Sequence, residues 1–219
     1  MPTFVFVVFR ISVQQSSHQL SFIYLRKKIA IGKPTIETIS ALRDFFIARN
    51  GSEMGEALQL LCKSIGEPPS ISQNLDDLEF SYNRLFIGPK SVPAPPFASV
   101  YIDPEHQLMG VSTTRILNLY KLLGLSSPWE GSVPPDHLSV ELDAVIHFKN
   151  ILAENYSEEL TAIWHYFLHN HLAVWVPQFI DRVMAEKNIP AELRLVINQL
   201  REWLEKEIAA DTQSANTNS

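Results

Sequence analysis

The sequence predicts an all-α fold, organised as a single helical domain of two lobes joined by a proline-containing linker. Apolar residues recur every three or four positions along most of the chain, which is the period of a helix with one buried face. Strand-like alternation is almost confined to the first 33 residues, and glycine and proline punctuate the helical stretches. With 219 residues, 46% of them hydrophobic, the chain is long enough to bury a sizeable core.

Composition and punctuation divide the chain into five parts. We expect an N-terminal extension or diverged first helix over 1–33, an N-terminal helical lobe over 34–125, a linker over 126–135, a C-terminal helical lobe over 136–210 and a disordered tail over 211–219. The linker, "SSPWEGSVPP", is rich in the residues that interrupt helices. The tail is polar and lacks apolar periodicity.

Four helices are expected in the N-terminal lobe. The first begins near Thr35 and stops at Asn50, and Ser52 is the expected N-cap of the second. The third ends in a proline-rich loop, and the fourth runs from about Ser112 to Leu123. The apolar positions that predict these helices are Ile36, Ile39, Leu42 and Phe46, then Met54, Ala57, Leu58 and Leu61, then Leu75, Leu78, Tyr82 and Leu85, and finally Ile116, Leu119, Tyr120 and Leu123.

Four more helices are expected in the C-terminal lobe. Asp136 can cap the first of them, Ser157 can cap the second, and Pro190 opens the last. Their apolar positions are Leu138, Leu142, Val145 and Leu152, then Leu160, Ile163 and Phe167, then Leu172, Val176, Phe179 and Val183, and finally Leu193, Ile197, Leu200 and Leu204.

The start of the chain is strand-like in "FVFVVF", but it lacks the basic region and cleavage site of a secretory signal. No run approaches the roughly 18 apolar residues of a membrane span. We therefore expect a cytoplasmic protein with no stable membrane insertion. The single cysteine, Cys62, lies in an apolar pattern and is expected to be a small buried hydrophobe.

Charge and motifs exclude several classes of function. The net charge of −6 and the absence of a basic stripe argue against a nucleic-acid partner. The chain contains neither G-x-x-x-x-G-K-[ST] nor G-x-G-x-x-G, which cradle phosphates, and it lacks the G-x-S-x-G of α/β-type serine hydrolases. We expect no catalytic residue, no metal and no cofactor.

A histidine pair leaves one enzymatic alternative open. His165 and His169 have the spacing of a metalloprotease helix, but Tyr166 stands where that motif requires a glutamate. The stretch offers no third ligand unless His171 bends round to serve. A His-dependent metal hydrolase and a generic helical scaffold are the alternatives to a binding protein.

Two proline-rich stretches suggest peptide binding. "RLFIGPKSVPAPPF" (84–97) carries four prolines after a helix end, and "VPPDHL" (133–138) places an aspartate beside a histidine. The first can be a rigid link packed on the core or an apolar docking surface for an extended peptide. Asp136 can cap a helix, pair with an arginine guanidinium, or do both.

Taken together, these stretches resemble the TorD/DmsD family of redox-enzyme maturation chaperones. The hallmark aromatic-x-x-Leu-Phe run is present as "YNRLF" (82–86), and the Asp-His element follows as "PPDH" (134–137). "PAPPF" (93–97), "SVY" (99–101) and "HLAVW" (171–175) also match, and the resemblance covers roughly residues 75 to 208. The family's Asp-His element often has a glutamate three residues before the aspartate, where this chain has Val133.

The resemblance implies a function. The family's members bind the twin-arginine signal peptide or the apo catalytic subunit of a molybdenum-cofactor oxidoreductase of the dimethyl-sulfoxide or trimethylamine-N-oxide reductase type, and they assist cofactor loading before export. It also suggests a monomer or a dimer that exchanges helical lobes. The motif positions associated with peptide binding fall on Tyr82, Leu85, Phe86, Pro96, Phe97, Asp136 and His137.

Overall fold

Every regular element of the computed structural model, which describes residues 33–68, 75–88 and 92–217, is helical, and the all-α prediction is confirmed. The strand-like start of the chain lies outside the described residues. The elements are α1 (Lys33–Ile47), α2 (Gly51–Ile65), α3 (Leu75–Tyr82), the π-helical segment η1 (Asn83–Ile87), α4 (Ser99–Ile102), α5 (Val111–Leu122), α6 (Leu138–Glu154), α7 (Glu158–Phe167), the π-helical segment η2 (Leu168–Leu172), α8 (Ala173–Ala185) and α9 (Ala191–Thr217).

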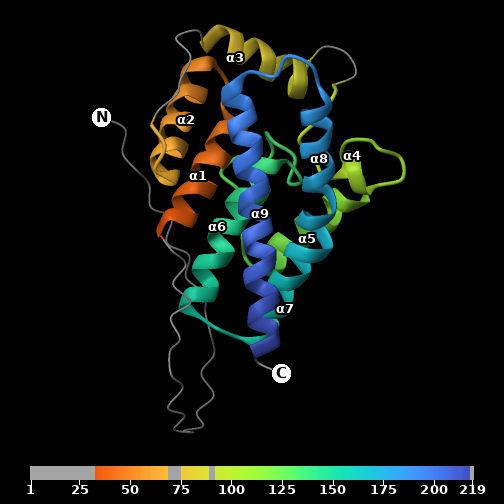
Figure 1. Cartoon of the computed structure of the whole chain (residues 1–219). Coiled ribbons are helices and arrows are strands. Elements are labelled where there is room, and N and C mark those ends of the chain that lie inside the picture. The colour runs from red at the N-terminus through yellow and green to blue at the C-terminus, as the bar shows by residue number, and fades with distance from the viewer. Residues whose placement is uncertain (1–32, 69–74, 89–91, 218–219) are drawn as a thin grey trace, which may run out of the picture.

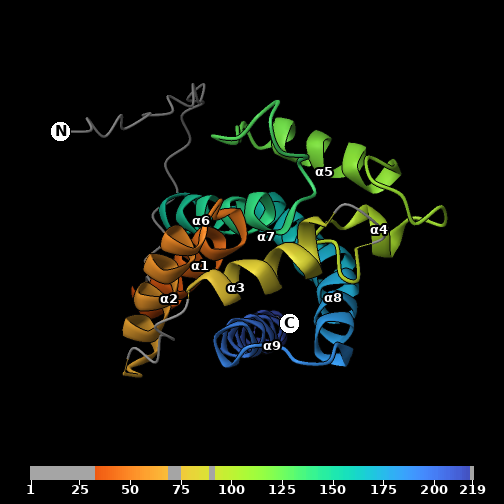
Figure 2. The same cartoon turned by 90° about the horizontal axis from the view of Figure 1, so that it is seen from above.

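The helices form a bundle in which α1 packs against both α2 and α6 (Figure 1). Helix α9 runs along the bundle beside α8, and α3 crosses one end of it. Viewed from above, α4 lies against α8, and α5 extends from α4 at the outer edge of the molecule (Figure 2).

Buried side chains from both halves of the chain form one hydrophobic cluster, which confirms the expected continuous core. Ile39 of α1 and Leu204 of α9 are both members, although they lie far apart in the sequence. Trp129 and Val133 of the segment 126–135 pack against the same cluster. The division into two lobes joined by this segment stays a prediction.

The helix caps of α7 and α2 can be compared with those that the sequence predicts. Ser157 caps α7 as predicted, because its hydroxyl accepts the Leu160 N–H at 3.1 Å. Helix α2 is capped by Asn50 instead of Ser52, since the Asn50 side chain accepts the Glu53 N–H at 3.0 Å. Helix α2 therefore begins at Gly51, two residues earlier than a cap at Ser52 would place it.

Helix α9 continues to Thr217, through most of the polar stretch that was expected to be disordered. Part of the reason is long-range, since the Asp211 carboxylate bonds to two histidines of α7 and η2. Cys62 is 1% exposed, as expected for a small buried hydrophobe. Within the described ranges, no helix combines the length and apolar character that crossing a membrane would require.

Candidate peptide-binding site

Three side chains of the "YNRLF" run, those of Tyr82, Leu85 and Phe86, lie in the core, where α3 ends and the π-helical segment η1 begins. Leu85 is fully buried, and Tyr82 and Phe86 are each 3% exposed. The Tyr82 hydroxyl donates to the Phe46 carbonyl at 2.7 Å, and burial raises the pKa of Tyr82. The Phe86 ring lies 4.9 Å from the ring of Tyr82 and 5.6 Å from that of Phe179. These side chains therefore support the fold from within.

The proline loop and the Asp-His element meet in a short antiparallel bridge between Phe97 and His137. The Leu138 N–H donates to the Pro96 carbonyl at 2.9 Å, and the Ala98 N–H donates to the Asp136 carbonyl at 3.0 Å. The Phe97 and His137 rings pack edge to face at 4.9 Å. Two motifs about 40 residues apart in the sequence are thus one structural unit.

Asp136 does not cap α6, so that part of the sequence reading is wrong. Its Oδ2 accepts the Ser99 N–H at 3.0 Å, at the start of α4. The cap of α6 is His137, whose Nδ1 accepts the Ser139 N–H at 3.2 Å. Burial lowers the pKa of His137 to about 4, because desolvation penalises the imidazolium, and the neutral ring can accept this bond.

The second oxygen of Asp136 is the unusual feature of this unit. The residue is fully buried, yet Oδ1 has no hydrogen-bond partner among the residues that the structure describes. Buried carboxylate oxygens are nearly always paired, because leaving one unpaired costs a large desolvation penalty. An oxygen in this state is suited to accept from a cationic donor.

A buried acidic group lies behind the bridge, and the sequence reading missed it. Glu141 of α6 is fully buried, and its carboxylate accepts from Trp175 Nε1 at 2.9 Å and lies 2.6 Å from His171 Nε2. Burial raises the pKa of Glu141, and the charge of Asp136 raises it further. The "HLAVW" motif therefore has a structural explanation, since its histidine and tryptophan both bind Glu141.

Tyr120 completes the group, because its hydroxyl donates to the Pro135 carbonyl at 3.2 Å. Burial raises the pKa of Tyr120, and the nearby carboxylates of Glu141, Asp136 and Asp143 raise it further. The Asp-His element therefore lies close to a group of buried carboxyl side chains.

Of the seven predicted residues, only Phe97 is partly exposed, and the other six are buried. The surface around Phe97 is apolar and stiff. It consists of partly exposed side chains on either side of the bridge, namely Val92, Pro93, Pro95, Val133, Pro134 and Pro135.

The histidine pair has a third partner that was not expected. That partner is not His171, which bonds to Glu141. It is Asp211 of α9, whose carboxylate bonds to both His165 and His169. Asp211 is 42 residues beyond His169, so local spacing gave no sign of it.

Comparison with known proteins agrees with this architecture. Residues 48–181 match the family model described as nitrate reductase delta subunit. The "Probable Tat proofreading chaperone DmsD" of Haemophilus influenzae is 29% identical over 136 residues, which are 61% of this chain and 62% of that protein. The Tat proofreading chaperone DmsD of Salmonella typhi is 34% identical over 110 residues, which are 48% of each chain. The chain thus spans about half to three-fifths of the length of these relatives.

A crystal structure from Archaeoglobus fulgidus, described as that of a redox enzyme maturation protein, has a similar fold. The TM-score is 0.54 at 21% identity, covering 85% of this chain and 99% of that one. This likeness shows the all-helical fold, and the family model covers more than half of the chain.

The chain belongs to the TorD/DmsD family, the family that its motifs resemble. This is a family of chaperones and not of catalysts, so the reading as a metal hydrolase is set aside.

Proposed function

We propose that this protein is a cytoplasmic chaperone that binds the twin-arginine signal peptide, or the apo form, of a molybdenum-cofactor oxidoreductase and assists cofactor loading before export. Membership of the TorD/DmsD family supports the proposal, as does the similarity to relatives that are named Tat proofreading chaperones. The net charge of −6 suits a cationic ligand.

The observation that carries the proposal is the unpartnered Asp136 Oδ1 beneath the Phe97–His137 bridge. An arginine guanidinium is a good partner for a carboxylate, because its donors match the carboxylate lone pairs and it keeps its charge in a desolvated site. Oδ2 stays engaged with the Ser99 N–H, so a peptide arginine would bind Oδ1 without uncapping α4.

The seven motif residues divide into two roles in this proposal. Tyr82, Leu85, Phe86 and Pro96 are buried and form the platform on which the loop is fixed. Phe97, Asp136 and His137 contact the peptide. The apolar surface around Phe97 receives the hydrophobic part of the signal, and its prolines reduce the entropy lost when the loop is ordered by binding.

Access to Asp136 requires a local opening of the bridge. Two backbone hydrogen bonds join the bridged segments. The Leu138 N–H donates to the Pro96 carbonyl, and the Ala98 N–H donates to the Asp136 carbonyl. A single bridge of this kind is a small cooperative unit, and such units open at a lower free energy than the core. Peptide binding would then replace the Phe97–His137 ring contact, and a charged hydrogen bond to Asp136 Oδ1 would form.

The function is tested by calorimetric titration of the full chain with a synthetic twin-arginine signal peptide, its Lys-Lys variant and a scrambled peptide. We expect the twin-arginine peptide to bind most tightly, because a guanidinium is more weakly hydrated than an ammonium and so loses less on entering a desolvated site. A generic helical scaffold predicts equal affinity for all three peptides, and that result would refute the proposal.

A further inference from the structure

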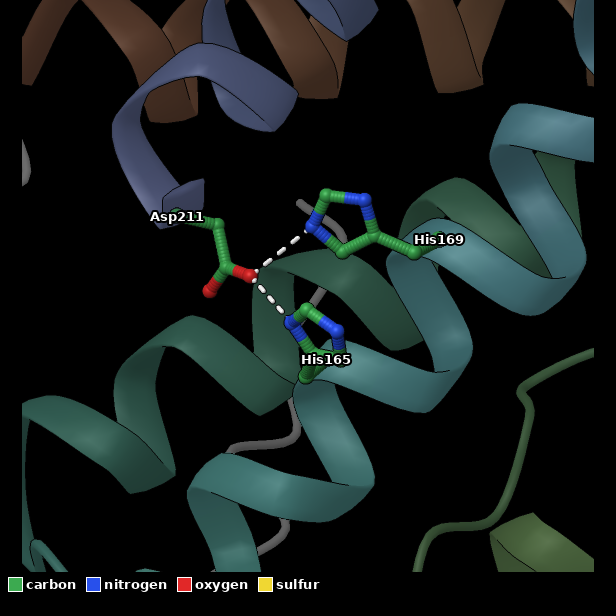
Figure 3. A group of neighbouring side chains, drawn as sticks. All are labelled: His165, His169 and Asp211. Carbon is green, nitrogen blue, oxygen red and sulfur yellow. Dashed lines mark hydrogen bonds and ion pairs between the residues drawn. The ribbon is translucent and has the colours of Figure 1, made fainter. Parts of the chain in front are cut away.

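We propose that His165, His169 and Asp211 form a binding site for a divalent transition-metal ion, with zinc as the ion that fits best. The three side chains converge where the end of α7 and the segment η2 meet the C-terminal part of α9 (Figure 3). This inference is independent of the peptide-binding function.

The geometry brings three ligand atoms to one point. Asp211 Oδ2 lies 2.8 Å from His165 Nδ1 and 2.9 Å from His169 Nε2. All three ligand atoms lie within 4.8 Å of one another. The two imidazole rings lie with their centroids 4.2 Å apart and their planes tilted by 33°, and each presents a nitrogen to the same carboxylate (Figure 3).

This set of ligands is a familiar one for zinc. Zinc binds imidazole nitrogen and carboxylate oxygen at about 2.0 to 2.2 Å, and sites with three protein ligands leave a fourth position for water. Tetrahedral bonds of that length separate the ligand atoms by about 3.3 Å. The Asp211 oxygen would therefore move away from the histidines by about half an ångström, which a side-chain rotation can supply.

Two further features favour a metal over a simple ion pair. Among the described residues, the ion-pair partners of Asp211 are the two histidines, so no lysine or arginine there occupies the carboxylate. The site is also open to solvent on one side, since the His165 side chain is 53% exposed while that of Asp211 is only 13% exposed. An ion can enter from water and then be held by a mostly buried carboxylate.

The backbone at this position supports the arrangement. His169 lies in the π-helical segment η2, and single π turns inside helices occur often at functional sites. Because Asp211 belongs to the last turns of α9, a bound metal would cross-link the C-terminal part of that helix to α7 and η2. Tyr166 follows the first histidine where a metalloprotease has its general base, so the site we propose is structural and not hydrolytic.

The test uses tag-free full-length protein, because a polyhistidine tag would itself bind the ion. Zn²⁺ is titrated by calorimetry, and Co²⁺ is titrated by its visible absorption, which reports tetrahedral coordination. The variants are His169→Gln and Asp211→Asn, with His165→Gln in reserve. The matched control is His147→Gln, since His147 is an exposed histidine that faces a single carboxylate, that of Asp143.

We expect one zinc ion per chain in the wild type and in the His147→Gln control. Each ligand variant should bind zinc at least about tenfold more weakly, since even changes in the groups that orient a ligand cost about 10- to 100-fold in affinity. Zinc should also raise the melting temperature of the wild type, and the same zinc concentration should raise that of Asp211→Asn by less.

Absence of zinc binding by the wild type would overturn the inference and leave a hydrogen-bonded cluster. Equal affinity in the wild type and all variants would place the ion elsewhere and would overturn it equally. Circular dichroism of each variant checks that a loss of binding does not come from a loss of fold, and His165→Gln replaces any variant that fails this check.

Discussion

Replacing Tyr82 with phenylalanine should lower the free energy of unfolding by about 1 to 2 kcal/mol and leave peptide binding unchanged. The Tyr82 hydroxyl donates at 2.7 Å to the carbonyl of Phe46, which lies in the last turn of α1, where helical carbonyls lack partners within the helix. The variant keeps the ring contacts with Phe45 and Phe86, so no cavity term is added. What remains is one lost buried hydrogen bond, worth about 1 kcal/mol, with a further penalty for the unpaired carbonyl.

Urea unfolding followed by circular dichroism measures this change, and the melting temperature should fall by about 2 to 4 °C per kcal/mol for a chain of this length. Tyr156→Phe is the matched control, because Tyr156 is 67% exposed and its variant should unfold like the wild type. The platform role of Tyr82 would be refuted by unchanged stability together with weaker binding of a twin-arginine peptide.

Three other outcomes are expected. Gly110→Ala should lower the melting temperature, because an added Cβ would clash with the buried Asp103 carboxylate and displace it from the Ser112 N–H and hydroxyl; thermal unfolding measures this, and an unchanged melting temperature would contradict it. Because burial lowers the pKa of His137 to about 4 from an ordinary value of 6.5, the unfolded state binds a proton that the folded state does not, and stability should fall as the pH drops from 6.5 to about 4. His137→Asn keeps a capping oxygen and should lose less stability over that window in urea titrations; equal losses would remove His137 as a cause. If residues 126–135 are a hinge for lobe exchange, light scattering should detect a dimer beside the monomer after refolding at high concentration, and monomer alone at every concentration would oppose it.

The helices were predictable because their signals are local. Apolar periodicity and N-caps such as Ser157 depend on residues within one or two helical turns. They therefore predict a helix without knowledge of its tertiary contacts. The cap of α2 shows the limit of such local signals, since Asn50 forms it and not Ser52. Both residue types are good N-caps, and the sequence does not show which of the two begins the helix.

The candidate site was only partly predictable, because its decisive contacts are long-range. Sequence motifs pointed to Asp136 and Phe97, but nothing near Asp136 shows that its carboxylate reaches the backbone of Ser99, 37 residues away. The partners of Glu141 lie 30 and 34 residues distant, and periodicity alone cannot reveal them. A glutamate on the otherwise apolar start of α6 was the one available sign of a buried polar group.

The burial of Tyr82, Leu85 and Phe86 also follows from tertiary packing. An aromatic-Leu-Phe run reads equally well as a docking surface or as core, since both are apolar. In the fold, Phe86 of this run contacts Phe46 and Phe179, which come from opposite halves of the chain. These tertiary contacts, and not the sequence pattern, show that the run belongs to the core.

The central claim, that Asp136 pairs with an arginine of a signal peptide, is tested most directly by a double-mutant cycle. The wild type and Asp136→Asn are each titrated with a twin-arginine peptide and with its Lys-Lys variant. Asparagine can still accept the Ser99 N–H, so the variant should fold. Asp103→Asn is the matched control, because Asp103 is another buried aspartate whose carboxylate accepts at the start of a helix, but both of its oxygens accept hydrogen bonds from Ser112 of α5.

The account predicts that Asp136→Asn weakens twin-arginine binding by about 5- to 150-fold, which corresponds to about 1 to 3 kcal/mol for a hydrogen bond to a charged group. The preference for arginine over lysine should shrink in Asp136→Asn and persist in Asp103→Asn. An arginine preference of the same size in the wild type and in Asp136→Asn, with both proteins folded, would contradict the account.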